Sequence, residues 1–165
     1  MLKLRLLSSM FFCCLLLVCS GSSFAQSPEA ITESDVVALI NSVDQATKKK
    51  NLEGILAPLA SDIKIKLVVS TPGRDKEEVV HLNKEQLAEI TKRTLRQRFA
   101  YTLERKNTRV KLYDDNKTAM VTSDLYETVT TARGKFRAVS AETSVVTLRD
   151  GKLLFISVET RIRFY

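Results

Sequence analysis

The stretch ETSVVTLRDGKLLFISVETRIRF, residues 142–164, decides the fold of this chain. Its centre, Asp150-Gly151-Lys152, is typical of a tight β-hairpin turn, and both flanks are rich in Val, Thr, Ile and Phe. The pattern predicts two long antiparallel strands, Phe136 to Arg149 and Leu153 to Phe164, joined by that turn.

Two more strands of the same kind precede this hairpin. The first runs from Phe99 to Tyr113 and ends at a polar turn, and the second, Thr118 to Thr131, is dense in β-branched residues. Arg133-Gly134-Lys135 separates the second strand from the closing hairpin. Four consecutive strands of this length predict a large antiparallel meander, which must twist and curl because long flat sheets are unfavourable.

Helical signals dominate the chain before the meander. Thr32, followed three residues later by Asp35, predicts a capping box at the start of a first helix. Apolar residues then recur at helical spacing: Val36, Leu39, Ile40 and Val43. We expect a second, short helix over Leu52 to Leu59, and a third that begins at the cap Asn83 with Gln86 three residues on.

A short β-hairpin is predicted between the second and third helices. Ile63, Ile65 and Leu67 alternate with lysines, which indicates a strand with one apolar face and one wet face. Thr71-Pro72-Gly73 is a turn signal, and Val79 to Leu82 is the expected returning strand.

This order of elements resembles the nuclear transport factor 2-like superfamily, which includes SnoaL-like polyketide cyclases and ketosteroid isomerases. The residues that carry the resemblance are the helix Asp35 to Lys50, the segment Leu52-Glu53-Gly54-Ile55-Leu56, and residues 142–153 with their Asp-Gly-Lys turn. Many members place Trp directly after that turn, where this chain has Leu153.

The resemblance implies an α+β fold: a curved antiparallel sheet with the N-terminal helices packed on its concave face, as in the cystatin-like cone. Residues 26–165 would form one such SnoaL-like domain, with a pocket at the open end of the cone. The alternative is a different exported α+β sheet protein.

Dimerisation through the other face of the sheet is common among these relatives. In this chain Leu153-Leu154-Phe155-Ile156 is apolar at successive positions, so both faces of that strand are expected to be buried. We therefore expect a homodimer, with a different partner protein as the alternative.

Residues 1–25 have the three parts of a secretory signal peptide. Lys3 and Arg5 are followed by the apolar run Leu6 to Cys19, and Ser23-Phe24-Ala25 places small residues before a cleavage site. We expect cleavage after Ala25, a periplasmic or secreted protein, and no stable membrane anchor after cleavage. A permanent anchor is the first alternative, and a lipid anchor on Cys19 is the second.

Removal of the signal changes the composition. All three cysteines lie within residues 1–25, so the mature chain has no disulfide, thiolate metal site or cysteine nucleophile. The net charge falls from +7 to +5, because Lys3 and Arg5 leave and residues 1–25 hold no acid. We expect no cofactor. We also expect no metal site, since one histidine does not make a metal cluster. An exported protein rarely meets nucleic acid, so we expect no nucleic-acid partner.

Five side chains are candidates for a site. Asp124 and Tyr126 are two residues apart in a strand, so they share a face and could line the cone as acid and hydroxyl donor; exposure to solvent or to a dimer partner is the favoured interpretation. The resemblance places Asp62 near the base of ketosteroid isomerases. His81 and Glu142 are the polar residues that a pocket would use.

Basic residues are frequent in the meander. Glu159, Arg161 and Arg163 share one face of the last strand. The other members of this basic set are Arg105, Arg109, Lys111, Arg133, Lys135 and Arg137. Glu and Arg on neighbouring strands can pair, so a solvated face is favoured over an anion-binding surface.

The expected function is non-enzymatic: an exported cone that binds a small apolar ligand or a protein partner. An isomerase, dehydratase or cyclase that uses a pocket carboxylate as its base is the first alternative. A structural subunit of an envelope assembly is the second.

Overall fold

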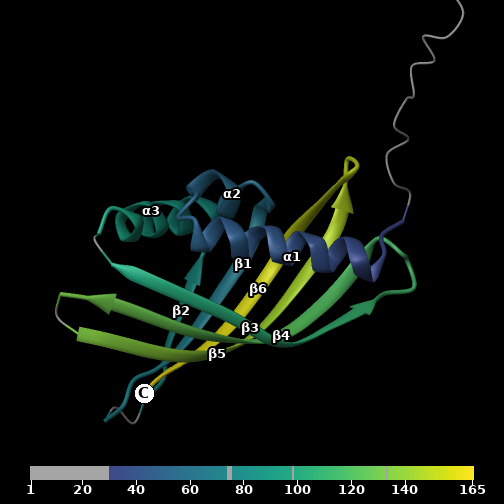
Figure 1. Cartoon of the computed structure of the whole chain (residues 1–165). Helices are drawn as coiled ribbons and strands as arrows, with labels where there is room; N and C mark the ends of the chain where they lie inside the picture. Colours follow the sequence, from purple (N-terminus) through teal and green to yellow (C-terminus); the bar gives the residue numbers. More distant parts are fainter. Residues whose placement is uncertain (1–29, 74–75, 98, 133) are drawn as a thin grey trace, which may run out of the picture.

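The computed structural model describes residues 30–73, 76–97, 99–132 and 134–165. Three helices lie on one face of a curved six-stranded sheet (Figure 1), as predicted for an α+β cone. The expected signal peptide, residues 1–25, lies outside the described residues.

The helices begin where the capping signals predict. They are α1 (Glu33–Lys48), α2 (Leu52–Leu56) and α3 (Lys84–Leu95). The capping boxes of Thr32 with Asp35 and of Asn83 with Gln86 are both formed, so the first-turn amides have partners. The second helix ends at Leu56, earlier than predicted, because the chain enters its first strand at Leu59.

The strands are β1 (Leu59–Ser70), β2 (Glu78–Leu82), β3 (Ala100–Leu112), β4 (Thr118–Thr131), β5 (Gly134–Arg149) and β6 (Lys152–Phe164). The predicted meander β3–β6 is confirmed, and the sheet order is β2-β1-β6-β5-β4-β3. The sheet is mixed, since β6 pairs in parallel with β1 while all other pairs are antiparallel. Strand β6 pairs with the edge of β1 that β2 does not occupy.

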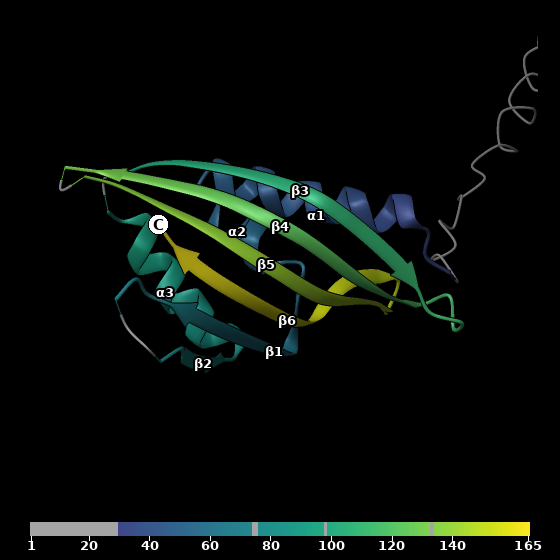
Figure 2. The ribbon, with the colours of Figure 1, turned by 90° about the horizontal axis from the view of Figure 1, so that it is seen from below.

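The hydrophobic core lies between α1 and the concave face. Val36 and Ile40 of α1 pack with residues from four strands, including Ile63, Val121 and Phe155. Figure 2 shows the strands curving past the helices, with α3 beside β1 and β2. Burial of these apolar side chains is the main driving force for closing the cone.

A β-bulge in β6 explains the apolar run that motivated the dimer. Val145 pairs with Ser157 and Val146 with Phe155, so Ile156 is an extra residue that resets the alternation. Leu153 and Phe155 belong to the helix-facing core, whereas Leu154 is on the opposite face and partly buried. The homodimer stays a prediction.

Candidate functional site

Asp124 and Tyr126 lie on the outer, convex face of the sheet. The odd-numbered neighbours Val121 and Leu125 are buried against the helices, so the even-numbered side chains of β4 point away from them. Tyr126 is 37% exposed, and Asp124 accepts a hydrogen bond from Asn107 Nδ2 at 2.7 Å. The pair therefore does not line the cone.

Asp62 and His81 also lie away from the interior. Asp62 is exposed and pairs with Arg149 at 2.6 Å; that hydrogen bond lowers the pKa of Asp62. His81 is exposed on the edge strand β2, opposite Lys66 and next in sequence to the core-facing Leu82. Neither Asp62 nor His81 can therefore reach a ligand inside the cone.

Glu142 is the one candidate of the five that points inside the cone. It belongs to a buried ionic cluster with Arg105 of β3 and Asp44 of α1. The guanidinium forms a two-pronged bond to Asp44 (Nε to Oδ2 2.9 Å, Nη2 to Oδ1 3.0 Å), and Nη1 lies 2.7 Å from Glu142 Oε1. Nη1 also donates to the Ser123 hydroxyl. The cluster ties α1 to the strands β3, β4 and β5.

The cluster keeps Arg105 charged in a mostly dry place. The side chains of Arg105 and Asp44 are each 12% exposed, and that of Glu142 is 19% exposed. Burial by itself lowers the pKa of Arg105, but the hydrogen bonds and charges of Asp44 and Glu142 outweigh it and raise the pKa. Two-pronged guanidinium–carboxylate bonds are strong and directional, so they fix the position of α1.

The sequence pattern groups Arg105 with the basic outer residues, and a bulge in β3 is the reason that its side chain instead points inside. Lys106 pairs with Asp124 and Arg109 with Thr122, so β3 carries one extra residue between them. Asn107 there has φ 53°, a left-handed conformation that Asn tolerates better than most residues. The sequence contained one indication of a buried cation: Asp44 is an acid four residues after Ile40, so it lies on the buried face of α1.

An apolar pocket of about 330 Å³, the α3 pocket, lies between α3, the end of α1 and the sheet. Its apolar walls come from Ile55, Ile90, Leu95, Phe99 and Val129. Three polar side chains lie in its sheet wall, Tyr101, Glu127 and Thr131, and the Tyr101 hydroxyl donates to Glu127 Oε1. Glu127 Oε2 has no hydrogen bond among the described residues.

Burial, followed by the negative charge of Glu127, raises the pKa of Tyr101. The phenol therefore keeps its proton and holds the Glu127 carboxylate in a fixed orientation. Lys50 is at the rim, where Nζ donates to the Phe99 carbonyl oxygen at 2.8 Å and lies 3.9 Å from the Phe99 ring centroid. The pocket thus offers apolar walls and one carboxylate oxygen that accepts hydrogen bonds.

Tyr101 and Glu127 are not among the candidates expected from the sequence. The signal was present in β4, where Val121, Leu125 and Val129 are apolar at alternate positions, which puts Glu127 on the core side. Tyr101 faces Val129 across the β3–β4 pair and so joins Glu127 on that side.

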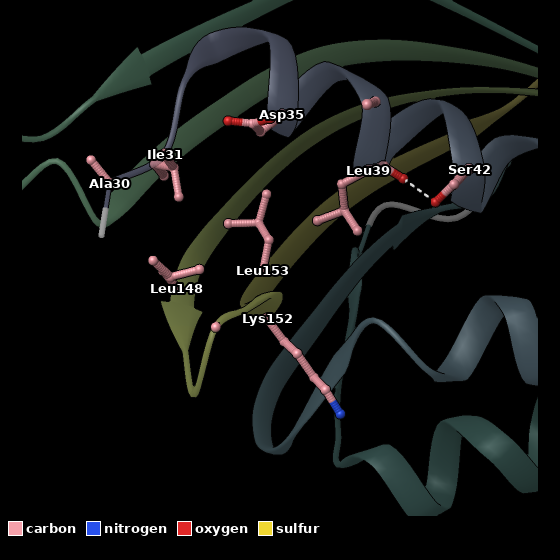
Figure 3. Close-up of a pocket in the computed structure, with 10 residues that line it drawn as sticks. Ala30, Ile31, Asp35, Leu39, Ser42, Leu148, Lys152 and Leu153 are labelled. Atoms are coloured by element: carbon pink, nitrogen blue, oxygen red, sulfur yellow. Dashed lines mark hydrogen bonds between the residues drawn. The ribbon is translucent and has the colours of Figure 1, made fainter. Parts of the chain in front are cut away.

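A second pocket, the α1 pocket, lies between the first half of α1 and the β5–β6 turn (Figure 3) and holds about 520 Å³. Its walls are apolar, with Leu39, Leu148 and Leu153 pointing into it. Of its three polar side chains, Asp35 accepts from the Thr32 backbone and Ser42 donates to the Leu39 carbonyl at 2.7 Å. The third, the exposed Lys152, extends away from the apolar walls in Figure 3. The smaller α3 pocket is therefore the better candidate site, because polar groups and a shifted pKa converge there.

Within the described ranges, no group of three or more His, Cys, Asp or Glu side chains could hold a metal ion, and no helix is long and apolar enough to cross a membrane.

Neither the protein-family models nor the curated proteins contain a match to this sequence. Among solved structures, the chain is similar to a scytalone dehydratase-like protein from Novosphingobium aromaticivorans (12% identity, 77% of this chain and 80% of that chain covered, TM-score 0.63). Two nuclear transport factor 2-like proteins are also similar. The one from Cytophaga hutchinsonii has 13% identity, 79% and 98% coverage and TM-score 0.61, and the one from Rhodospirillum rubrum has 14%, 78% and 98%, and 0.60.

These similarities define the class: the chain has the nuclear transport factor 2-like α+β cone fold. The resemblance stated from the sequence is confirmed at the level of the fold. At these identities the comparisons show the fold alone, and the site must be argued from its own residues.

We expect replacement of Arg105 by Met to lower the free energy of unfolding by about 3–5 kcal/mol, because Asp44 and Glu142 would remain buried without a partner. Urea denaturation measures this. Arg109→Met, an exposed position on the same strand, is the matched control and should change stability by less than about 1 kcal/mol. Equal effects of the two substitutions would contradict the assignment of a stabilising buried cluster.

Proposed function

We propose that this protein binds a small ligand in the α3 pocket, with an apolar body against the walls and one hydroxyl group that donates to Glu127. The observation that carries this proposal is a half-buried carboxylate, fixed by Tyr101, in a mostly apolar pocket.

The pocket size and chemistry support a small amphipathic ligand. About 330 Å³ is at the lower end of the range of small-molecule sites, so a ligand of one or two fused rings fits. A carboxylate only accepts hydrogen bonds, so the ligand must supply the donor. The charged acceptor then discriminates against analogues that lack a hydroxyl, because it would lose its water without gaining a partner.

A second candidate, proton-transfer catalysis, is favoured by the same pair. A carboxylate beside a phenol in an apolar pocket is an arrangement that isomerases and dehydratases use: one group takes a proton from carbon, and the other donates to the developing oxyanion. Here the Tyr101 hydroxyl donates to Glu127 itself. It would have to change partner during a reaction, so binding without turnover is the leading proposal.

Export and dimerisation belong to this proposal as well. Residues 1–25 support export, and the apolar side chain of Leu154 on the outer face supports a homodimer. An envelope assembly remains the alternative role.

The binding proposal predicts that Glu127→Gln weakens binding of 2-naphthol, an apolar probe with one hydroxyl, by about tenfold or more. A hydrogen bond to a charged group contributes roughly 1.5–3 kcal/mol, and 1.4 kcal/mol corresponds to a factor of ten. The chain has no tryptophan, so the fluorescence of the probe can be followed without interference from the protein.

The matched control for this titration is Glu104→Gln, the loss of an exposed acid that pairs with Lys106 on the outer face of β3. It should leave the affinity unchanged. If 2-naphthol binds wild type and Glu127→Gln equally well, the α3 pocket is not the site.

Exchange of the α-protons of 1-tetralone in D₂O separates the two candidate functions. Followed by NMR, the exchange should run at the rate of buffer if the protein only binds its ligand. Exchange accelerated by wild type and abolished in Glu127→Gln would replace the binding proposal with a proton-transfer enzyme.

Native mass spectrometry of the protein expressed with its own signal tests export and oligomeric state together. We expect a dimer whose chains begin at Gln26, together with any ligand that stays bound. Chains that retain residues 1–25 would contradict cleavage, and a monomer at micromolar concentration would contradict the homodimer.

A further inference from the structure

Two phenylalanines are exposed on the inner face of the sheet, close to the α3 pocket. Phe136 of β5 is 52% exposed, and Phe164 of β6 is 39% exposed. Both share the inner face with the buried Ala138, because Phe136 precedes Ala138 by two residues in the same strand and Phe164 pairs with it. Large apolar side chains that gather at one exposed place mark a binding surface.

The strand registers connect these two rings to the α3 pocket. Val129, an apolar wall of the pocket, pairs with Phe136, and Glu127 pairs with Ala138. Ala138 pairs in turn with Phe164. A continuous apolar surface, the apolar strip, therefore leads out of the pocket across β4, β5 and β6, and it consists of Val129, Phe136, Ala138 and Phe164. Glu127 lies beside the end of the strip that is in the pocket.

The strip is long enough for an alkyl chain of about nine carbons. From Val129 to Phe164 there are two inter-strand steps of about 4.8 Å and two residues of about 3.4 Å along the strand, which give a diagonal of roughly 12 Å. An extended alkyl chain advances by roughly 1.3 Å per carbon, since a C–C bond is about 1.5 Å long and the chain zigzags.

The exposed area of the strip is too small for a stable protein interface. A phenylalanine side chain has roughly 150–250 Å² of surface, so the two half-exposed rings present about 200 Å². A stable interface buries about 800 Å² on each partner. The expected homodimer uses the outer face of the sheet, so it would leave the strip uncovered. The tail of a small ligand matches the strip in area, length and position.

We propose that the ligand of the α3 pocket is an amphiphile with a linear alkyl tail, such as a long-chain alcohol or an alkylphenol. Its hydroxyl-bearing head lies in the pocket and donates to Glu127, and its tail lies on the apolar strip, past Phe136 toward Phe164. This inference rests on the proposed function of the pocket and adds the class of ligand. Full burial of one methylene group strengthens binding about fourfold; a chain on an open strip has one side covered, so we expect about twofold per methylene.

4-Alkylphenols from ethyl to heptyl are the probes, and isothermal titration calorimetry measures their affinities. For wild type the affinity should rise about thirtyfold over these five methylene groups, at about twofold for each. Phe136→Thr/Phe164→Thr should reduce the rise to less than about fourfold, because the strip loses both rings while threonine keeps the strand propensity. This variant should bind 2-naphthol, which has no tail, within about twofold of wild type, because neither phenylalanine lines the α3 pocket.

Two matched controls should keep the full rise in affinity. Phe136→Leu/Phe164→Leu retains an apolar strip. Val79→Thr/Tyr126→Thr removes two exposed apolar side chains from the outer face instead.

An affinity that does not depend on chain length would overturn the inference, as would an equal rise in wild type and the double threonine variant. A homodimer that Phe136→Thr/Phe164→Thr dissociates in native mass spectrometry would also overturn it, because a second copy would then cover the strip. If 2-naphthol binds and chain length has no effect, the α3 pocket stands as the site and only the alkyl tail is wrong. If neither 2-naphthol nor any alkylphenol binds, the proposed function fails as well.

Discussion

The position of α1 on the sheet depends on one buried ionic cluster. Arg105 extends from the concave face of the sheet toward α1 and is bound on one side by Asp44 and on the other by Glu142. An unpaired charge in that place would be costly, so arrangements of α1 and the three strands that separate these side chains are disfavoured. The apolar core contributes more of the free energy of folding, but apolar contacts do not fix one orientation of α1 on the sheet. The ionic cluster fixes that orientation.

The α3 pocket follows from that constraint. The end of α1 forms one side of the pocket, and the sheet that Arg105 joins to α1 forms another. Tyr101 and Glu127 are consequently presented on a rigid wall, as a site that recognises one hydrogen-bond donor requires. The two faces of the sheet differ in charge: the interior holds acids compensated by Arg105, and the outer face holds exposed cations such as Lys106, Arg109 and Arg137. One sheet therefore presents two chemically different surfaces.

Much of the fold could be predicted because its signals are local. Capping boxes at Thr32 and Asn83, and turn residues at Asp150-Gly151, each act within a few residues. The site could be predicted only in part. Bulges at Asn107 and Ile156 reset the alternation of β3 and β6, so the direction of Arg105 could not be read from period two alone. The inward direction of Glu127 could have been predicted, because it lies an even number of residues from the buried Val121 and Leu125 in the same strand. The direction of its partner Tyr101 depends on how β3 pairs with β4.

The central claim is that the α3 pocket, with the carboxylate fixed by Tyr101, is where this cone binds its ligand. A crystal structure of the protein with 2-naphthol tests it most directly. We predict density for the rings among Ile90, Phe99 and Val129, with the hydroxyl oxygen within hydrogen-bonding distance of Glu127. Density in the α1 pocket beside Leu148 and Leu153, with the α3 pocket closed by its own side chains, would contradict the claim.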